Sequence, residues 1–124
     1  MWEHWDGINE NGDFWDPGMN SFNHYAYGAV GDWMFSAMVG ISPDDDRGGA
    51  GYSRIIYSPL ADKRVGFVKG SIKTANGTLM AEWKYLDDGR VHYELTIPDG
   101  TAAEVKIPGL DAITVEGGTH AFIV

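Results

Sequence analysis

The segment LMAEWKYLDDGRVHYELTI, residues 79–97, alternates apolar and polar side chains with a period of two. The apolar side chains of residues 79–85 share one face, and those of residues 91–97 do the same. Glu82 and Glu94 are among the polar side chains that take the opposite face. Between the two runs, Asp88-Gly89 is a dipeptide typical of a tight hairpin turn. The segment therefore predicts two antiparallel strands, 79–85 and 91–97.

The same two-residue period continues through most of the chain after residue 52. Asn76-Gly77 predicts a second tight turn, and the Pro-Asp-Gly sequence at residues 98–100 predicts a third. Further strands are expected at residues 53–57, 65–72, 103–107, 113–115 and 121–124. Many short strands separated by turns are typical of an antiparallel β-sandwich, so the fold class is predicted to be mainly β.

The chain before residue 47 has a different pattern. Residues 1–20 contain three glycines and a proline and are expected to form a loop. Residues 21–41 predict one helix, with Ser21 as its cap and Ser42-Pro43 at its end. That helix is apolar almost all round, which is typical of a helix buried inside a larger domain. We therefore expect two parts, an incomplete helical piece at 1–46 and a β-sandwich domain at 47–124, joined through a linker at 42–51.

The uncovered helix predicts how the chain behaves in solution. A single apolar helix with one aromatic loop cannot surround its own apolar surface. We expect the helix to fold back onto the sandwich, to be swapped between chains, or to make the protein a homo-oligomer.

Composition excludes several classes of function. The 124 residues carry a net charge of −9. All of it falls on residues 1–46, which hold nine of the 18 acidic residues and none of the nine Lys and Arg. An acidic surface repels phosphate backbones, so nucleic acid is not an expected partner. There is no Cys for a disulfide or a thiolate, and no apolar run long enough to cross a membrane. The sequence predicts a soluble protein and leaves its compartment unknown.

The first residues combine an acid with flat apolar rings. Glu3 stands between Trp2 and Trp5, and His24 follows in a polar-aromatic run. Aromatic rings can cover the C–H faces of a sugar while a carboxylate binds its hydroxyls or activates water, so this segment is a candidate sugar site. A solvated loop acid beside tryptophans, and a buried histidine at a helix start, are the alternative interpretations.

No cofactor and no metal ion are expected. The sequence Asn9-x-Asn11-Gly12 is similar to part of an EF-hand loop, but Gly7 and Gly18 occupy the positions where the first and last acidic ligands belong. No phosphate-binding loop, nucleophile elbow or zinc spacing is present.

Three segments carry a resemblance to a known family. WEHWDG at residues 2–7 and DPGMNSFNHYAYGAVGDW at residues 16–33 resemble the end of the catalytic domain of bacterial α-L-rhamnosidases. GYSRIIYSP at residues 51–59 is similar to the entry into the C-terminal β-sandwich of that family.

The resemblance implies a fold and an activity. It implies that residues 1–46 end an (α/α)6 barrel, and that the parent enzyme hydrolyses terminal α-L-rhamnose from glycosides with inversion. It makes Glu3 the general base and His24 a sugar contact. Trp2 and Trp5 are candidate sugar-binding rings from their residue type, and burial in the core of the parent barrel is the alternative. The general acid of the family lies upstream in the barrel, so the chain alone is expected to be inactive. The alternative from another class is a non-catalytic carbohydrate-binding or structural β-sandwich module.

Overall fold

The protein forms two compact units. A computed structural model describes residues 2–18 and 21–124 of the chain. The first unit spans Met1–Asp32 and the second spans Trp33–Val124. The second unit contains the sheet, and the first consists of loops and short helical turns.

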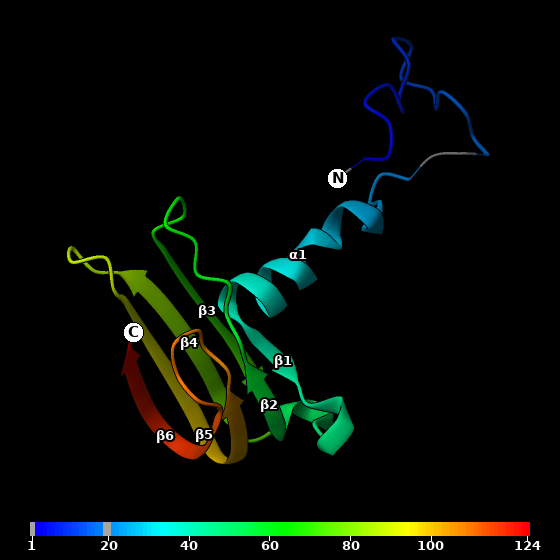
Figure 1. Cartoon of the computed structure of the whole chain (residues 1–124). Coiled ribbons are helices and arrows are strands. Elements are labelled where there is room, and N and C mark those ends of the chain that lie inside the picture. The colour runs from blue at the N-terminus through cyan, green and yellow to red at the C-terminus, as the bar shows by residue number, and fades with distance from the viewer. Residues whose placement is uncertain (1, 19–20) are drawn as a thin grey trace. The chain divides into compact units, whose positions relative to one another are not determined.

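A six-stranded sheet makes up most of the second unit (Figure 1). Its strands are β1 Ile41–Pro43, β2 Arg54–Tyr57, β3 Phe67–Thr74, β4 Gly77–Tyr85, β5 Val91–Val105 and β6 Ile113–Ile123. They are ordered β1-β2-β5-β4-β3, and β6 pairs with β5. The prediction of a mainly β fold is confirmed. Neighbouring strands run antiparallel, with the difference that β2 pairs with the second half of β5 in parallel.

The long strand β5 differs from the predicted pattern. The strands expected at 91–97 and 103–107 are one strand, and the turn expected at residues 98–100 is an irregularity inside it, where the pairing with β6 shifts register between Ile97 and Ala102. Gly100 takes a φ of +79°, which lets the strand bend without breaking. β6 likewise joins the strands expected at 113–115 and 121–124. The turn prediction at 98–100 was therefore wrong, because a glycine in the left-handed region serves a bulge as well as a turn.

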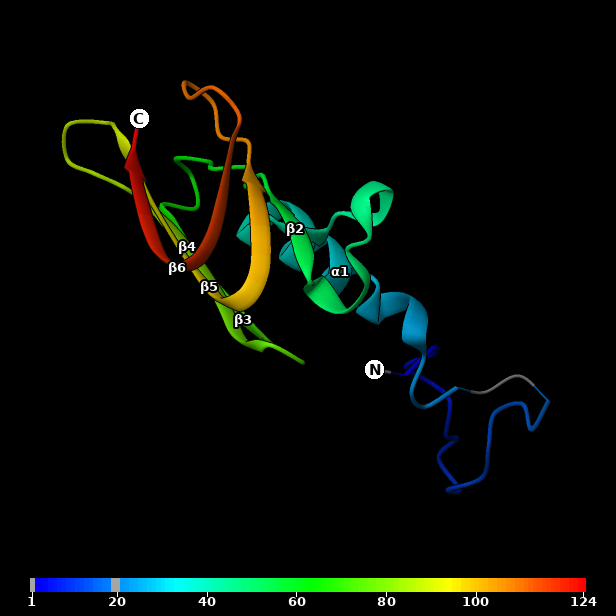
Figure 2. The same ribbon diagram turned by 90° about the horizontal axis from the view of Figure 1, so that it is seen from below.

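The bend in β5 curls the sheet. Figure 2 shows β5 and β6 curving together, so that the two halves of β5 belong to different parts of the sheet. The first half pairs with β4 and the second half pairs with β2. Alternate residues of both halves are buried, and they join a single hydrophobic core. Its largest fully buried side chains are Trp83, Tyr57, Ile41, Ile55, Leu79, Leu95 and Val105.

The helical segment is shorter and less regular than expected. Helical turns run through η1 Tyr25–Gly28, α1 Val30–Trp33 and η2 Met34–Val39, and Gly40 with a φ of +86° ends them. The predicted start at Ser21 was wrong: helical structure begins after His24, which makes no side-chain capping bond. The predicted linker also contains structure, namely β1 and the short turns η3 Asp45–Arg47 and η4 Ala50–Tyr52. Within the described residues, no helix is both long and apolar enough to span a lipid bilayer.

The end of the helical segment packs on the sheet within the second unit. Val39 is buried, and Phe35 packs against the same core. The indole nitrogen of Trp83 in β4 donates a hydrogen bond of 2.7 Å to the carbonyl of Met38. A Cβ atom placed on Gly70 of β3 would lie only 2.6 Å from Cγ2 of Val39, so the glycine lets η2 approach the strand closely. Phe35 and Val39 thus pack on the core of the sheet, whereas Trp33 and Met34 remain exposed.

Candidate functional site

The backbone of the first unit brings Glu3 beside the segment that ends at His24. The amide of Glu3 donates a hydrogen bond of 2.7 Å to the carbonyl of Ser21. The chain between them turns back through a small hairpin, in which Ile8 pairs with Phe14 and the amide of Trp15 donates to the carbonyl of Gly7 at 3.1 Å. Residues far apart in sequence therefore meet at one place.

Glu3 and His24 are in contact. Oε2 of Glu3 lies 3.9 Å from Nδ1 of His24, and the two side chains are 30% and 28% exposed. At this distance they attract one another as an ion pair when the imidazole is protonated. Both residues are half-buried, so water still reaches the carboxylate. The structure thus joins the predicted base and the predicted sugar contact, which are 21 positions apart in the chain.

Two aromatic rings lie close to the imidazole of His24. The ring of His24 stacks near Tyr25, with centroids 5.8 Å apart and an interplanar angle of 28°. Tyr27 meets it more steeply, at 5.8 Å and 61°. These two tyrosines were not among the predicted site residues. Their signal was present in the polar-aromatic run, but sequence alone did not say which rings would touch the imidazole.

The two predicted tryptophans have different surroundings. Trp2 packs edge-on against Phe22, with centroids 4.9 Å apart, and keeps 42% of its surface exposed. Trp5 is 92% exposed, so both faces of its indole are open to solvent. Trp2 is therefore held in place by a neighbour, whereas Trp5 offers a free ring.

His4 is an additional polar group beside Glu3. Its Nε2 is buried and has no hydrogen-bond partner among the described residues. Its ring lies 5.6 Å from that of Trp15.

The segment similar to an EF-hand loop is the tip of the hairpin. The side-chain oxygen of Asn9 accepts hydrogen bonds of 3.0 Å from the amides of Asn11 and Asp13, so it closes the turn. Asp16 similarly accepts a bond from the amide of Gly18 at 2.8 Å. In the part of the chain that the structure describes, no three His, Asp or Glu side chains are grouped to hold a metal ion.

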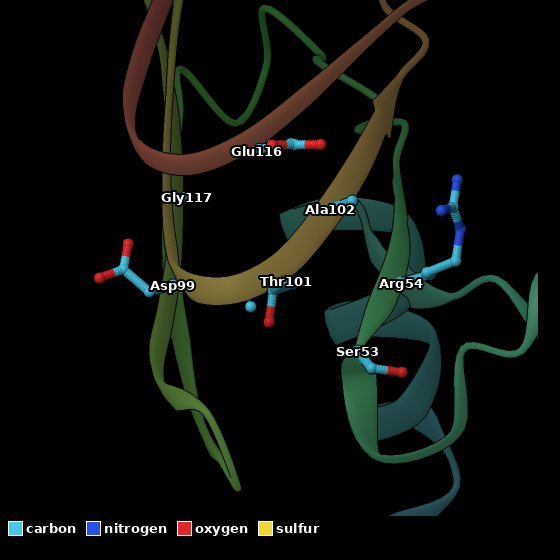
Figure 3. A pocket seen from close by; sticks show the side chains of 8 residues that line it. Ser53, Arg54, Asp99, Thr101, Ala102, Glu116 and Gly117 are labelled. Carbon is cyan, nitrogen blue, oxygen red and sulfur yellow. The ribbon is translucent and has the colours of Figure 1, made fainter.

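The second unit has a polar pocket of about 510 Å³ at the bend of β5 (Figure 3). Its lining includes Ser53, Arg54, Asp99, Thr101 and Glu116, with no aromatic ring. Figure 3 shows Asp99 and Arg54 pointing in opposite directions, so the charged groups do not converge on one ligand position. This pocket lacks the flat ring that a sugar platform needs.

Two family models match consecutive parts of the chain. Residues 40–122 match the family model described as the bacterial alpha-L-rhamnosidase C-terminal domain. Residues 1–38 match the 6 hairpin glycosidase domain of bacterial alpha-L-rhamnosidases.

Individual relatives agree with the family models. An alpha-L-rhamnosidase from Streptomyces avermitilis is 40% identical over 108 residues, which are 87% of this chain and 10% of the relative. One from an Alteromonas species is 34% identical over 107 residues, or 86% of this chain and 11% of the relative. The chain thus spans about a tenth of the length of these relatives.

Solved structures show the same likeness. The structure of the Streptomyces avermitilis alpha-L-rhamnosidase complexed with L-rhamnose matches with a TM-score of 0.77 and 32% identity. The match covers 100% of this chain and 13% of that chain. The native enzyme from Aspergillus terreus has a TM-score of 0.78 and 31% identity, with 100% of this chain and 14% of that chain covered. This chain therefore belongs to the bacterial alpha-L-rhamnosidase family, in which it matches the C-terminal region.

Proposed function

We propose that this chain supplies part of the active site of an inverting α-L-rhamnosidase, with Glu3 as the general base and His24 as a sugar contact. The observation that supports it best is the contact between Glu3 and His24, because the two residues singled out by family resemblance meet in space. Membership of the family supports the proposed substrate class, which is glycosides that carry a terminal α-L-rhamnose.

Hydrolysis with inversion requires a carboxylate that a water molecule can reach. In an inverting glycosidase the base takes a proton from a water molecule as the water oxygen attacks the anomeric carbon. The bond from that carbon to the leaving oxygen breaks, and a second carboxyl group protonates the leaving oxygen. Glu3 is half-buried and open to solvent, so it meets the first requirement. Trp5, with both faces exposed, is a candidate ring for the sugar.

We propose that the 124-residue chain alone does not hydrolyse rhamnosides. The group that faces Glu3 is an imidazole, and an inverting enzyme needs a second carboxyl group about 6.5–9.5 Å from the base. In this proposal the general acid comes from the upstream part of a complete enzyme.

A hybrid enzyme tests the proposal. The aligned C-terminal segment of the Streptomyces avermitilis relative is replaced by this chain, and release of p-nitrophenol from p-nitrophenyl α-L-rhamnoside is measured. We expect the hybrid to hydrolyse the substrate and a truncated relative without the segment not to do so. A hybrid that elutes as a folded protein and is inactive would contradict the proposal. If the full hybrid aggregates, a graft of residues 1–32 alone gives the same test while keeping the relative's own sheet domain.

The alternative function is sugar binding without catalysis. The observation in its favour is that the indole of Trp5 is exposed and that of Trp2 is partly exposed. Titration of the isolated chain with L-rhamnose, followed by tryptophan fluorescence, separates the two. Saturable binding by the chain together with an inactive hybrid would favour the binding module, whereas an active hybrid favours the enzyme.

A further inference from the structure

We propose that His24 is also the positioning residue for Glu3, and that its two ring nitrogens have separate tasks. Nδ1 holds the carboxylate, and Nε2 is left to accept a hydrogen bond from a sugar hydroxyl. The inference rests on the proposed function, since it takes Glu3 as the general base. It adds a role that a sugar contact alone does not require.

The backbone fixes the distance between the two groups. The hydrogen bond from the amide of Glu3 to the carbonyl of Ser21 ties the acid to a point only three residues before His24. The backbone of His24 itself is extended, with φ −74° and ψ 113°, immediately before η1 begins. The carboxylate and the imidazole are thus brought together by main-chain structure as well as by their mutual attraction.

Neighbouring rings fix the orientation of the imidazole. Tyr25 stacks near one face of His24, and Tyr27 approaches it at a steeper angle. Both contacts come from η1, which starts at the next residue. In this proposal the two ring contacts limit the rotation of the imidazole, so that Nδ1 stays on the side of Glu3.

Hydrogen-bond chemistry then assigns the proton. A neutral imidazole has one donor nitrogen and one acceptor nitrogen, and an ionised carboxylate only accepts. Nδ1 faces Oε2 of Glu3 at 3.9 Å, so the favourable tautomer carries its hydrogen on Nδ1. The separation is longer than a hydrogen bond, and such contacts commonly shorten when the substrate closes the site. Nε2 is then the acceptor, and the hydrogen bonds among the described residues leave it available to a substrate hydroxyl.

Two substitutions separate the two nitrogens. In His24→Asn the side-chain amide can place an N–H donor near the position of Nδ1, whereas in His24→Gln the amide oxygen can take the place of Nε2 as the acceptor. We expect His24→Gln in the hybrid enzyme to lower kcat about 10- to 100-fold with KM within about threefold, because Glu3 loses its partner. We expect His24→Asn to keep kcat within about threefold and to raise KM about tenfold, because one sugar hydrogen bond is lost.

The outcomes distinguish this inference from the proposed function. If His24→Gln keeps kcat, or if both variants lose kcat equally, Nδ1 does not position Glu3 and the inference is wrong. Glu3→Gln in the same hybrid is the separate test of the proposed function. An inactive Glu3→Gln with an unaffected His24→Gln would overturn the positioning role alone, whereas an active Glu3→Gln would overturn both.

A spectroscopic measurement needs no activity. In the ¹⁵N-labelled 124-residue chain, at a pH where the imidazole is neutral, nitrogen chemical shifts report which ring nitrogen carries the hydrogen. We expect the Nδ1–H tautomer for His24, and a shift toward the Nε2–H tautomer in Glu3→Ala. The Nε2–H tautomer in the unsubstituted chain would overturn the inference.

Discussion

Trp83 is the largest fully buried side chain of the sheet, and it links strand β4 to the helical segment. It is 1% exposed, and its indole nitrogen donates to the carbonyl of Met38 at 2.7 Å. Trp83→Phe removes that bond and leaves a gap, so we expect the free energy of unfolding to fall by about 2–4 kcal/mol in urea titrations. Trp5→Phe, at a position 92% exposed, is the matched control and should change it by less than about 0.5 kcal/mol. Equal effects at the two positions would show that Trp83 is not a core residue.

The buried hydroxyl of Tyr57 makes the free energy of unfolding depend on pH. Burial, followed by the nearby Tyr93 and Glu82, raises the pKa of its hydroxyl well above the ordinary value of 10.0. Above pH 10 the folded state therefore keeps a proton that the unfolded chain releases. The contribution of Tyr57 to the free energy of unfolding is complete below pH 10 and is lost as the pH rises above it. We expect the free energy of unfolding to decrease between pH 9 and 11, and to decrease less steeply in Tyr57→Phe. Identical slopes for the two proteins would contradict this role of Tyr57.

At the residue scale, the sequence offered candidate residues and did not show which of them contact one another. Family resemblance singled out Glu3 and His24, and the aromatic pattern added Trp2 and Trp5. The roles of all four at the site remain predictions. That Glu3 touches His24 depends on the bond from its amide to Ser21, a main-chain contact that leaves no mark in the side-chain pattern. The contacts of Tyr25 and Tyr27 with the imidazole could not be predicted from the sequence either.

At the scale of elements, the close approach of η2 to β3 depends on a glycine. A Cβ on Gly70 would lie 2.6 Å and 2.9 Å from the two methyl carbons of Val39. We expect Gly70→Ala to lower the free energy of unfolding by about 1–3 kcal/mol through overpacking. Ser71→Ala, at the neighbouring exposed position, is the control.

A double substitution checks that the clash is the cause. Val39→Ala makes room for the added methyl group, so Gly70→Ala should cost less in its presence, with a coupling energy of about 1 kcal/mol. Strict additivity of the two substitutions would mean that Gly70 acts in another way.

The strands were predictable and the bends were not. Period-two alternation located β2, β3, β4 and both halves of β5, because one face of each strand is buried. The bulge at residues 98–100 and the parallel pairing of β2 depend on long-range contacts, and Pro-Asp-Gly has the composition of an ordinary turn. The predicted helix start was wrong because the carbonyl of Ser21 accepts a hydrogen bond from the amide of Glu3, and helical structure begins only at Tyr25.

At the scale of the whole molecule, the hydrophobic core belongs to the second unit. All of its buried members lie between Val39 and Ile107. We therefore expect residues 33–124, expressed alone, to unfold cooperatively with a Tm within about 5 °C of that of the full chain, as followed by circular dichroism. Loss of sheet structure in the truncated protein would show that residues 1–32 are needed for the fold.

The boundary between the two parts of the chain falls at different residues in the sequence pattern, the compact units and the family matches. The sequence pattern suggested a change after residue 46, the two compact units divide after Asp32, and the family models meet between residues 38 and 40. The difference arises because Phe35 and Val39 are helical in sequence pattern but pack on the core of the sheet. Homo-oligomerisation through the exposed helical residues stays a prediction.

The most direct test of the account is the turnover of Glu3→Gln in the hybrid enzyme. The substitution keeps the size of the side chain and removes its ability to take a proton from water. We expect kcat to fall by about 100-fold or more with an unchanged Tm, whereas Glu10→Gln at the exposed hairpin tip leaves kcat unchanged. A Glu3→Gln hybrid that keeps more than about a hundredth of the unsubstituted activity would contradict the assignment of Glu3 as the general base.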